Sequence, residues 1–203
     1  IALGETVTLE VTPDNFGRIA AQTAKQVLIQ KLRDAEADLV YNEYKDKVFQ
    51  VVTGTVRQKE GSNIIIDLGR GEALLKQREQ IENEDYNIGD RLKIYILEVK
   101  KSSQTPEVLV SRSHPNFVKK LFEIEVPEIA DGTVEVKGIA REPGYRTKIA
   151  VYSKESKVDC VGACVGMRGS RVKNIVQELN GEKIDIVPWS ADIETFCRNA
   201  MNP

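Results

Sequence analysis

The pattern of apolar and polar positions first predicts one strand and one long helix. Residues 6–11 alternate apolar and polar as a half-buried strand does. After the helix-start signal Thr-Pro-Asp at 12–14, apolar residues recur at helical spacing, and residues 18–53 contain no proline or glycine. A helix over residues 14–44 would be roughly 45 Å long at 1.5 Å per residue, which suits a strut. A coiled coil or an ordinary core helix is the alternative.

From residue 51 the apolar period changes to two, which is typical of strands. Short strands are predicted at 51–56, 64–69, 73–75, 91–97 and 107–111. Five short strands are too few for a large sandwich and favour a small OB-type barrel.

After residue 114 the pattern predicts a second mixed unit. A helix is followed by strands at 133–141 and 145–153, a small-residue helix at 158–165, a helix at 170–179 and a strand at 183–187. The predicted order is therefore α-β-β-α-α-β, and residues 192–203 resemble the start of a further helix. The fold class is α+β, with several domains.

Composition limits the chemistry that this chain can perform. Its 203 residues are 41% hydrophobic and 30% charged, and they include neither a membrane-spanning apolar run nor a secretory signal pattern. Three cysteines favour a reducing compartment, so we expect a cytoplasmic protein. The only histidine, His114, cannot by itself form a triad or a two-histidine metal site. We expect no catalytic residue, no metal and no cofactor.

Charge is segregated along the chain although the net charge is only −2. Residues 137–177 contain nine basic and three acidic side chains, a local charge of +6, whereas both flanking segments are negative. Such a segment predicts contact with a polyanion. A solvated face is the alternative.

The motif with the clearest chemistry is Gly166-Met167-Arg168-Gly169, placed between two predicted helices. Glycines allow positive φ and close approach to a sugar-phosphate chain, and the N-terminus of the next helix attracts phosphate. This is the KH signature, which predicts binding of single-stranded RNA, with a plain helix-turn-helix joint as the alternative. The candidate RNA-binding residues are the four loop residues, Ser170 and, from charge and adjacency, Arg171, Lys173, Arg146 and Lys148.

Other conspicuous residues have simpler interpretations. Cys160 and Cys164 lie four apart without further ligands nearby, so packing is favoured over a metal site. Trp189 at a strand end closes a core edge more readily than it stacks on a base. His114 precedes a proline, which indicates an extended linker. The acidic residues Glu79, Glu82, Glu84 and Asp85 are expected to form a solvated surface.

Five strings spread along the chain resemble the bacterial NusA family of transcription factors. They are FGRIAAQTAKQV (16–27), NEYKD (42–46), HPNFVKKLFEIEVPEI (114–129), IAREPGYRTKIAVYS (139–153) and VGACVGMRGSRVKNIVQELNGEKIDIV (161–187). The resemblance covers essentially the whole chain. It implies the end of a polymerase-binding domain with its connector helix (1–48), an S-one OB domain (49–113), a first KH domain of type II (114–190) and the start of a second (191–203).

The resemblance implies a non-enzymatic elongation factor that binds RNA polymerase and nascent RNA and modulates pausing, termination and antitermination. The loop at 166–169 matches the family position by position, so its RNA-contacting role is implied with it. Other antitermination factors are implied as partners, and we expect a monomer that binds no membrane. The alternatives are a polymerase-docking scaffold with little RNA binding of its own and an accessory RNA-binding module of an RNA-processing complex.

The barrel is the weaker candidate for RNA contact. Residues 51–68 contain no Phe, Tyr or Trp on which bases could stack. Ten basic residues balance ten acidic ones over 51–116. We expect the barrel to act as a spacer with auxiliary contacts.

Overall fold

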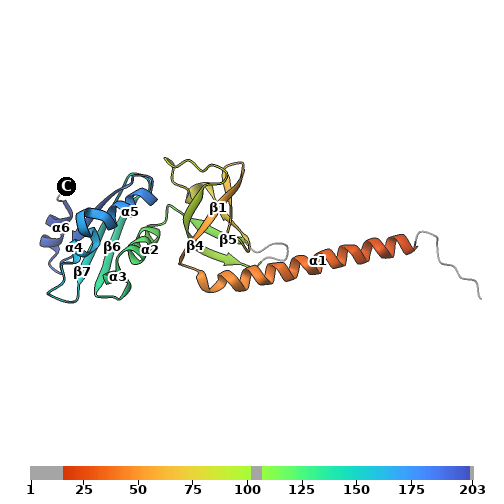
Figure 1. Ribbon diagram of the computed structural model, residues 1–203, viewed down its shortest axis with the longest axis horizontal. Helices are drawn as coiled ribbons and strands as arrows, with labels where there is room; N and C mark the ends of the chain where they lie inside the picture. The colour runs from red at the N-terminus through yellow and green to blue at the C-terminus, as the bar shows by residue number, and fades with distance from the viewer. Residues whose placement is uncertain (1–15, 102–106, 202–203) are drawn as a thin grey trace, which may run out of the picture.

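The computed structural model describes residues 16–101 and 107–201 (Figure 1). The strand expected at 6–11 lies outside the described residues. Helix α1 (Phe16–Tyr44) projects from the barrel as a long exposed rod. Only its C-terminal part is anchored: Ala37 and Tyr44 are buried, and the Tyr44 hydroxyl donates to the Leu68 carbonyl at 3.0 Å. Among the described helices, none has the length and apolar character needed to cross a bilayer.

The five predicted strands form a closed barrel, as expected. They are β1 (Val51–Glu60), β2 (Asn63–Asp67), β3 (Glu72–Leu75), β4 (Arg91–Lys100) and β5 (Glu107–Ser111), with short turns η1 (Lys45–Lys47) and η2 (Gln77–Glu79). The strand order is β1-β2-β3-β5-β4, and β3 and β5 pair in parallel. Alternation places Ile64 and Ile66 of β2 inside, against Val108 and Val110 of β5. The barrel core is therefore built from β-branched residues at period two.

The remaining elements follow the predicted α-β-β-α-α-β order, with one added turn of helix. They are α2 (Pro115–Glu125), α3 (Pro127–Ala130), β6 (Val134–Glu142), β7 (Arg146–Ser153), α4 (Cys160–Val165), η3 (Met167–Gly169), α5 (Ser170–Glu178), β8 (Lys183–Pro188) and α6 (Ile193–Met201). The sheet order is β6-β7-β8, antiparallel and then parallel. Phe117 of α2, Cys164 of α4 and Ile175 of α5 pack with Ile149 of the sheet into one core, which also includes Tyr95 of the barrel.

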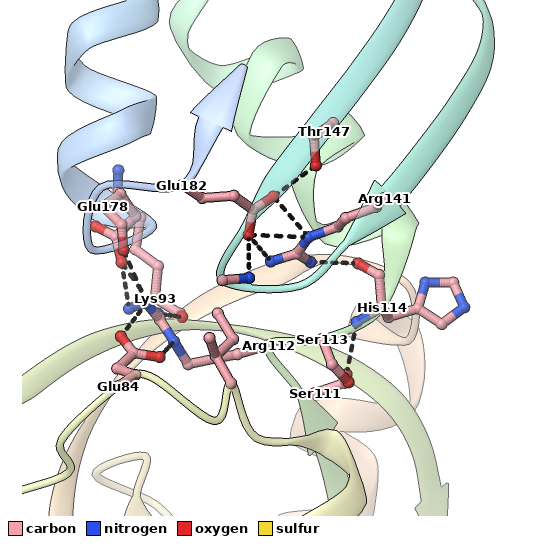
Figure 2. A network of polar contacts seen from close by, with 12 residues as sticks. Glu84, Lys93, Ser111, Arg112, Ser113, His114, Arg141, Thr147, Glu178 and Glu182 are labelled. Carbon is pink, nitrogen blue, oxygen red and sulfur yellow. Dashed lines mark hydrogen bonds and ion pairs between the residues drawn. The ribbon is translucent and has the colours of Figure 1, made fainter. Parts of the chain in front are cut away.

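One buried arginine ties the barrel to this second unit (Figure 2). The Arg112 side chain is fully buried, and it donates to both Glu84 carboxylate oxygens at 2.7 and 2.5 Å. It also donates to the Lys93 carbonyl of β4, at 2.5 Å, and to the Glu178 carbonyl at the end of α5, at 2.7 Å. A cation is favourable at a helix C-terminus. The expectation that Glu84 belongs to a solvated acidic surface is wrong, because a buried guanidinium requires a carboxylate partner.

A second buried pair lies beside the first, within the KH-like unit. Glu182 accepts from Arg141 at 2.9 Å, from the Thr147 hydroxyl at 2.5 Å and from the Gly144 backbone N–H at 2.8 Å. Arg141 also donates to the His114 carbonyl at 2.9 Å. His114 is therefore more than the expected extended linker: its Nδ1 caps α2 by accepting from the Asn116 N–H. Figure 2 shows its ring pointing away from the network.

Candidate nucleic-acid interface

The loop at 166–169 adopts a backbone conformation that its glycines permit and exposes the two side chains between them. Gly166, Arg168 and Gly169 have φ of 73°, 54° and 76°. Met167 is 88% exposed and Arg168 is also exposed. A non-glycine residue at positive φ, such as Arg168, is uncommon. The loop is thus an open surface on which a phosphate chain can lie.

Helix α5 begins at this loop with its N-terminus uncapped. Gly169 occupies the cap position, where no side chain accepts from the first N–H groups, and the first turn contains no acidic residue. Ser170 and Lys173 are exposed beside it. The free N–H groups and the positive end of the helix dipole favour an anion here.

Arg171 is an expected RNA contact, and its side chain packs against the loop and bonds to other parts of the same unit. Its Nη1 donates to Glu128 of α3 at 2.9 Å and to the Ala163 carbonyl near the end of α4 at 2.6 Å. Its side chain packs so closely under Gly166 that a Cβ there would lie 2.7 Å from the Arg171 Cγ. Arg171 is therefore paired with Glu128 and packs against Gly166.

Arg146 and Lys148, the other residues chosen from charge, also have partners. Both side chains lie on β7 and form ion pairs with Asp185 of the neighbouring strand β8, at 2.8 and 3.7 Å. Lys148 donates in addition to the Ala200 carbonyl of α6 at 2.7 Å. The structure therefore brings Gly166, Met167, Arg168, Gly169, Ser170 and Lys173 together around the loop, whereas Arg146 and Lys148 lie on β7 and are paired with Asp185.

The cations of the whole basic segment 137–177 can likewise be separated into those with an ion pair and those without one. Six of its nine cations form ion pairs within the unit: Lys137 and Lys154 with Glu135, Arg141 with Glu182, Arg146 and Lys148 with Asp185, and Arg171 with Glu128. Within the described ranges, the three cations without an ion pair are Lys157, Arg168 and Lys173. Of these three, Arg168 lies in the loop and Lys173 lies on the first turns of α5, so two of the cations without an ion pair are at or near the loop.

The residues with simpler interpretations take up packing positions. Cys164 is buried in the core, and burial raises the pKa of its thiol to about 12, which leaves it unreactive. Trp189 is half-buried and meets Tyr152 edge to face at 5.5 Å, with the Lys137 ammonium 5.6 Å from its ring centre. No group of three or more His, Cys, Asp or Glu in the described part of the chain could hold a metal ion.

Comparison with known proteins agrees with this arrangement. The family model of the NusA-like first KH domain matches residues 112–189, which hold the loop, the sheet and its helices, and that of the NusA N-terminal domain matches residues 1–38. A protein of Halalkalibacterium halodurans, named transcription termination/antitermination protein NusA, is 52% identical over 199 residues, 98% of this chain. The chain belongs to the NusA family.

Two more NusA relatives extend the likeness across distant bacteria. The Bacillus subtilis protein is 52% identical over 201 residues, 99% of this chain, and the Thermus thermophilus protein is 45% identical over 204 residues, 100% of it. The chain covers 52%, 54% and 53% of these three proteins and so spans about half the length of the curated NusA relatives that it matches.

Proposed function

We propose that this chain binds single-stranded RNA at the loop 166–169 and acts, by binding alone, in the control of transcription termination and antitermination. The observation that carries the proposal is the loop at an uncapped helix N-terminus, with the exposed cations Arg168 in the loop and Lys173 on the helix, neither of which has an ion pair among the described residues. KH modules clamp about four nucleotides with such a loop. The proposed process, transcription termination and antitermination, is taken from the names of the NusA relatives.

RNA polymerase is the proposed protein partner. Transcriptional pausing is the step that the chain is proposed to modulate. Support comes from α1, whose outer part carries Leu28 and Leu32 at 70% and 61% exposure. A long exposed helix with apolar side chains is typical of a docking surface. Nascent RNA and polymerase would then be held by opposite ends of one chain, in the bacterial cytoplasm, with further antitermination factors as additional partners.

The loop proposal is tested by replacing Met167 and Arg168 with aspartate. Both side chains are exposed, so the variant is expected to keep native circular dichroism. Two new negative charges at the phosphate contact should weaken binding of a short unstructured RNA by roughly tenfold or more, read by fluorescence anisotropy at fixed salt. The matched control is Leu32→Asp with Arg33→Asp, another exposed apolar-arginine pair, which should leave RNA binding unchanged.

The two variants also separate the alternatives. A folded loop variant that binds RNA as tightly as the wild type would overturn the loop site. If, in addition, the α1 variant loses binding to purified RNA polymerase, the chain is a polymerase-docking scaffold rather than an RNA-binding module.

A further inference from the structure

A row of exposed polar side chains begins at the loop and runs along α5 toward the barrel. Ser170, Lys173, Asn174 and Gln177 are all exposed. Their spacing of three and four residues places them on one face of the helix. Ser170 and Gln177 are seven residues apart, about 10 Å at 1.5 Å per residue. The exposed face of α5 thus connects the loop with the joint between KH-like unit and barrel.

At that joint the face of α5 ends in a pocket. The pocket has a volume of about 540 Å³ and lies between the two units. Its wall on the KH-like side includes Asn174, Gln177 and Asn180, and its barrel wall includes Arg91 and Leu92 at the start of β4. Within the described part of the chain, the Arg91 guanidinium forms no ion pair and the Gln177 amide forms no hydrogen bond. These two groups therefore remain available to a ligand.

The two walls are held in place before any ligand arrives. Arg112 joins Glu84 of the barrel side to the end of α5, and the Lys93 N–H of β4 donates to the Glu178 carboxylate at 3.2 Å. Asn180 donates to the Asn83 carbonyl at 3.2 Å, across the same joint. A preformed pocket binds without the cost of ordering its walls.

The lining chemistry favours a nucleobase over a phosphate inside the pocket. Arg112 pairs with both Glu84 and Glu178, Lys93 lies 4.0 Å from Glu125, and Glu125 also accepts from the Asn174 amide at 3.1 Å. The groups that remain available are the Gln177 carboxamide, which can pair with a base edge, the exposed carboxylate of Asp85, which can accept from base N–H groups, and the half-buried Leu92. Lys173 and Arg91 provide cations for phosphates on either side.

We infer that this pocket binds an unpaired base of the same RNA strand, beyond the nucleotides held by the loop. The inference rests on the RNA binding proposed above and assigns contacts to Arg91, Asn174 and Gln177. It also gives the barrel a role in binding through the first residues of β4, instead of through an aromatic surface.

The test compares a four-nucleotide RNA, which spans only the loop, with an eight-nucleotide RNA that can reach the pocket. Arg91→Gln and Gln177→Ala should each weaken the octamer on the order of threefold to tenfold, the loss of one polar contact, and leave the tetramer unchanged. Arg33→Gln on α1 removes the same charge as Arg91→Gln from an exposed arginine that lies outside the pocket, and should change neither affinity. Substituting the bases of the octamer one at a time should reveal a preference beyond the fourth base that Gln177→Ala abolishes.

The outcomes separate this inference from the proposed function. Equal octamer affinity for Arg91→Gln, Gln177→Ala and Arg33→Gln would overturn the pocket while leaving the loop site standing. A tetramer that binds the loop variant as tightly as the wild type would overturn the loop site itself. If Arg91→Gln weakens tetramer and octamer alike, the arginine acts through general charge and the pocket holds no base.

Discussion

At the scale of single residues, the distinction between paired and unpaired cations defines the candidate site. Arg168 and Lys173 have no ion-pair partner among the described residues, whereas Arg171 is held by Glu128 and the Ala163 carbonyl. A phosphate at Arg171 would have to compete with these partners for the guanidinium charge. RNA affinity should therefore depend on Arg168 and Lys173, and the shape of the loop on Arg171.

The two loop glycines are expected to respond differently to substitution by alanine. Both have positive φ, which costs a residue with a Cβ about 1–2 kcal/mol. At Gly169 the nearest atom to an added Cβ is 3.8 Å away, but at Gly166 the Arg171 side chain is only 2.7 Å away and must move. Gly166→Ala should therefore lower the free energy of unfolding more than Gly169→Ala, as measured by urea denaturation. Equal losses would show that the Arg171 contact adds no constraint.

At the scale of elements, the buried carboxylate of Glu182 joins β8 to the β6-β7 hairpin. Burial alone would raise its pKa, but hydrogen bonds from Arg141 and Thr147 bring the pKa below its usual value. The contribution to stability is therefore complete above the ordinary glutamate pKa near 4.5 and is lost as the pH falls through the lower pKa of the folded state.

This linkage predicts how the stability of a variant depends on pH. At pH 7, Glu182→Gln should be less stable than the wild type, because Arg141 loses its ionised partner in a buried place. The difference in free energy of unfolding should shrink as the pH falls below about 4.5. Urea titrations of both proteins at pH 7, 5, 4 and 3 measure this difference in the free energy of unfolding. A difference that stays constant over this range would contradict the assignment of the charge to Glu182.

The elements were largely predictable from the sequence, and the joint between them was not. Helical spacing predicted α1, period two predicted the barrel strands, and the glycine spacing predicted the loop at 166–169. Arg112 and Glu178 are 66 residues apart, so no local pattern reveals their contact. Counting charges likewise cannot distinguish Arg146, paired with Asp185, from Arg168. For the same reason, the local charge pattern wrongly predicted that Glu84 lies on a solvated surface.

At the scale of the whole molecule, barrel and KH-like unit share a core and a buried polar network. Tyr95 of β4 packs with Phe117 of α2, and Arg112 lies 5.4 Å from the centre of the Phe117 ring. Two units joined in this way should unfold together. The outer part of α1, which is exposed throughout, should open independently, with fast amide exchange over residues 17–33.

Loss of Arg112 should separate the two unfolding transitions. Arg112→Met leaves Glu84 and Glu178 without their buried partner, at a cost of about 3–5 kcal/mol. Fluorescence of Trp189, the single tryptophan, reports the KH-like unit, and amide exchange reports the barrel strands. The two midpoints should coincide in the wild type and in the control Arg70→Met, and differ in Arg112→Met. If that variant does not fold, Glu84→Gln provides the milder change, and coincident midpoints in both variants would contradict the prediction.

The anchoring of α1 to the barrel affects how the chain could bind one partner at the outer part of α1 and another at the loop 166–169. Tyr44 and Ala37 fix the helix to the barrel, and Arg112 fixes the barrel to the KH-like unit, so folded structure connects the outer helix to the RNA loop without a flexible linker. A flexible tether would give a second partner a broad range of separations, with an effective concentration that depends on tether length. A spacer of continuous folded structure instead favours partners whose own spacing matches it while the outer turns of α1 are helical, so the chain is expected to select by distance as well as by contact.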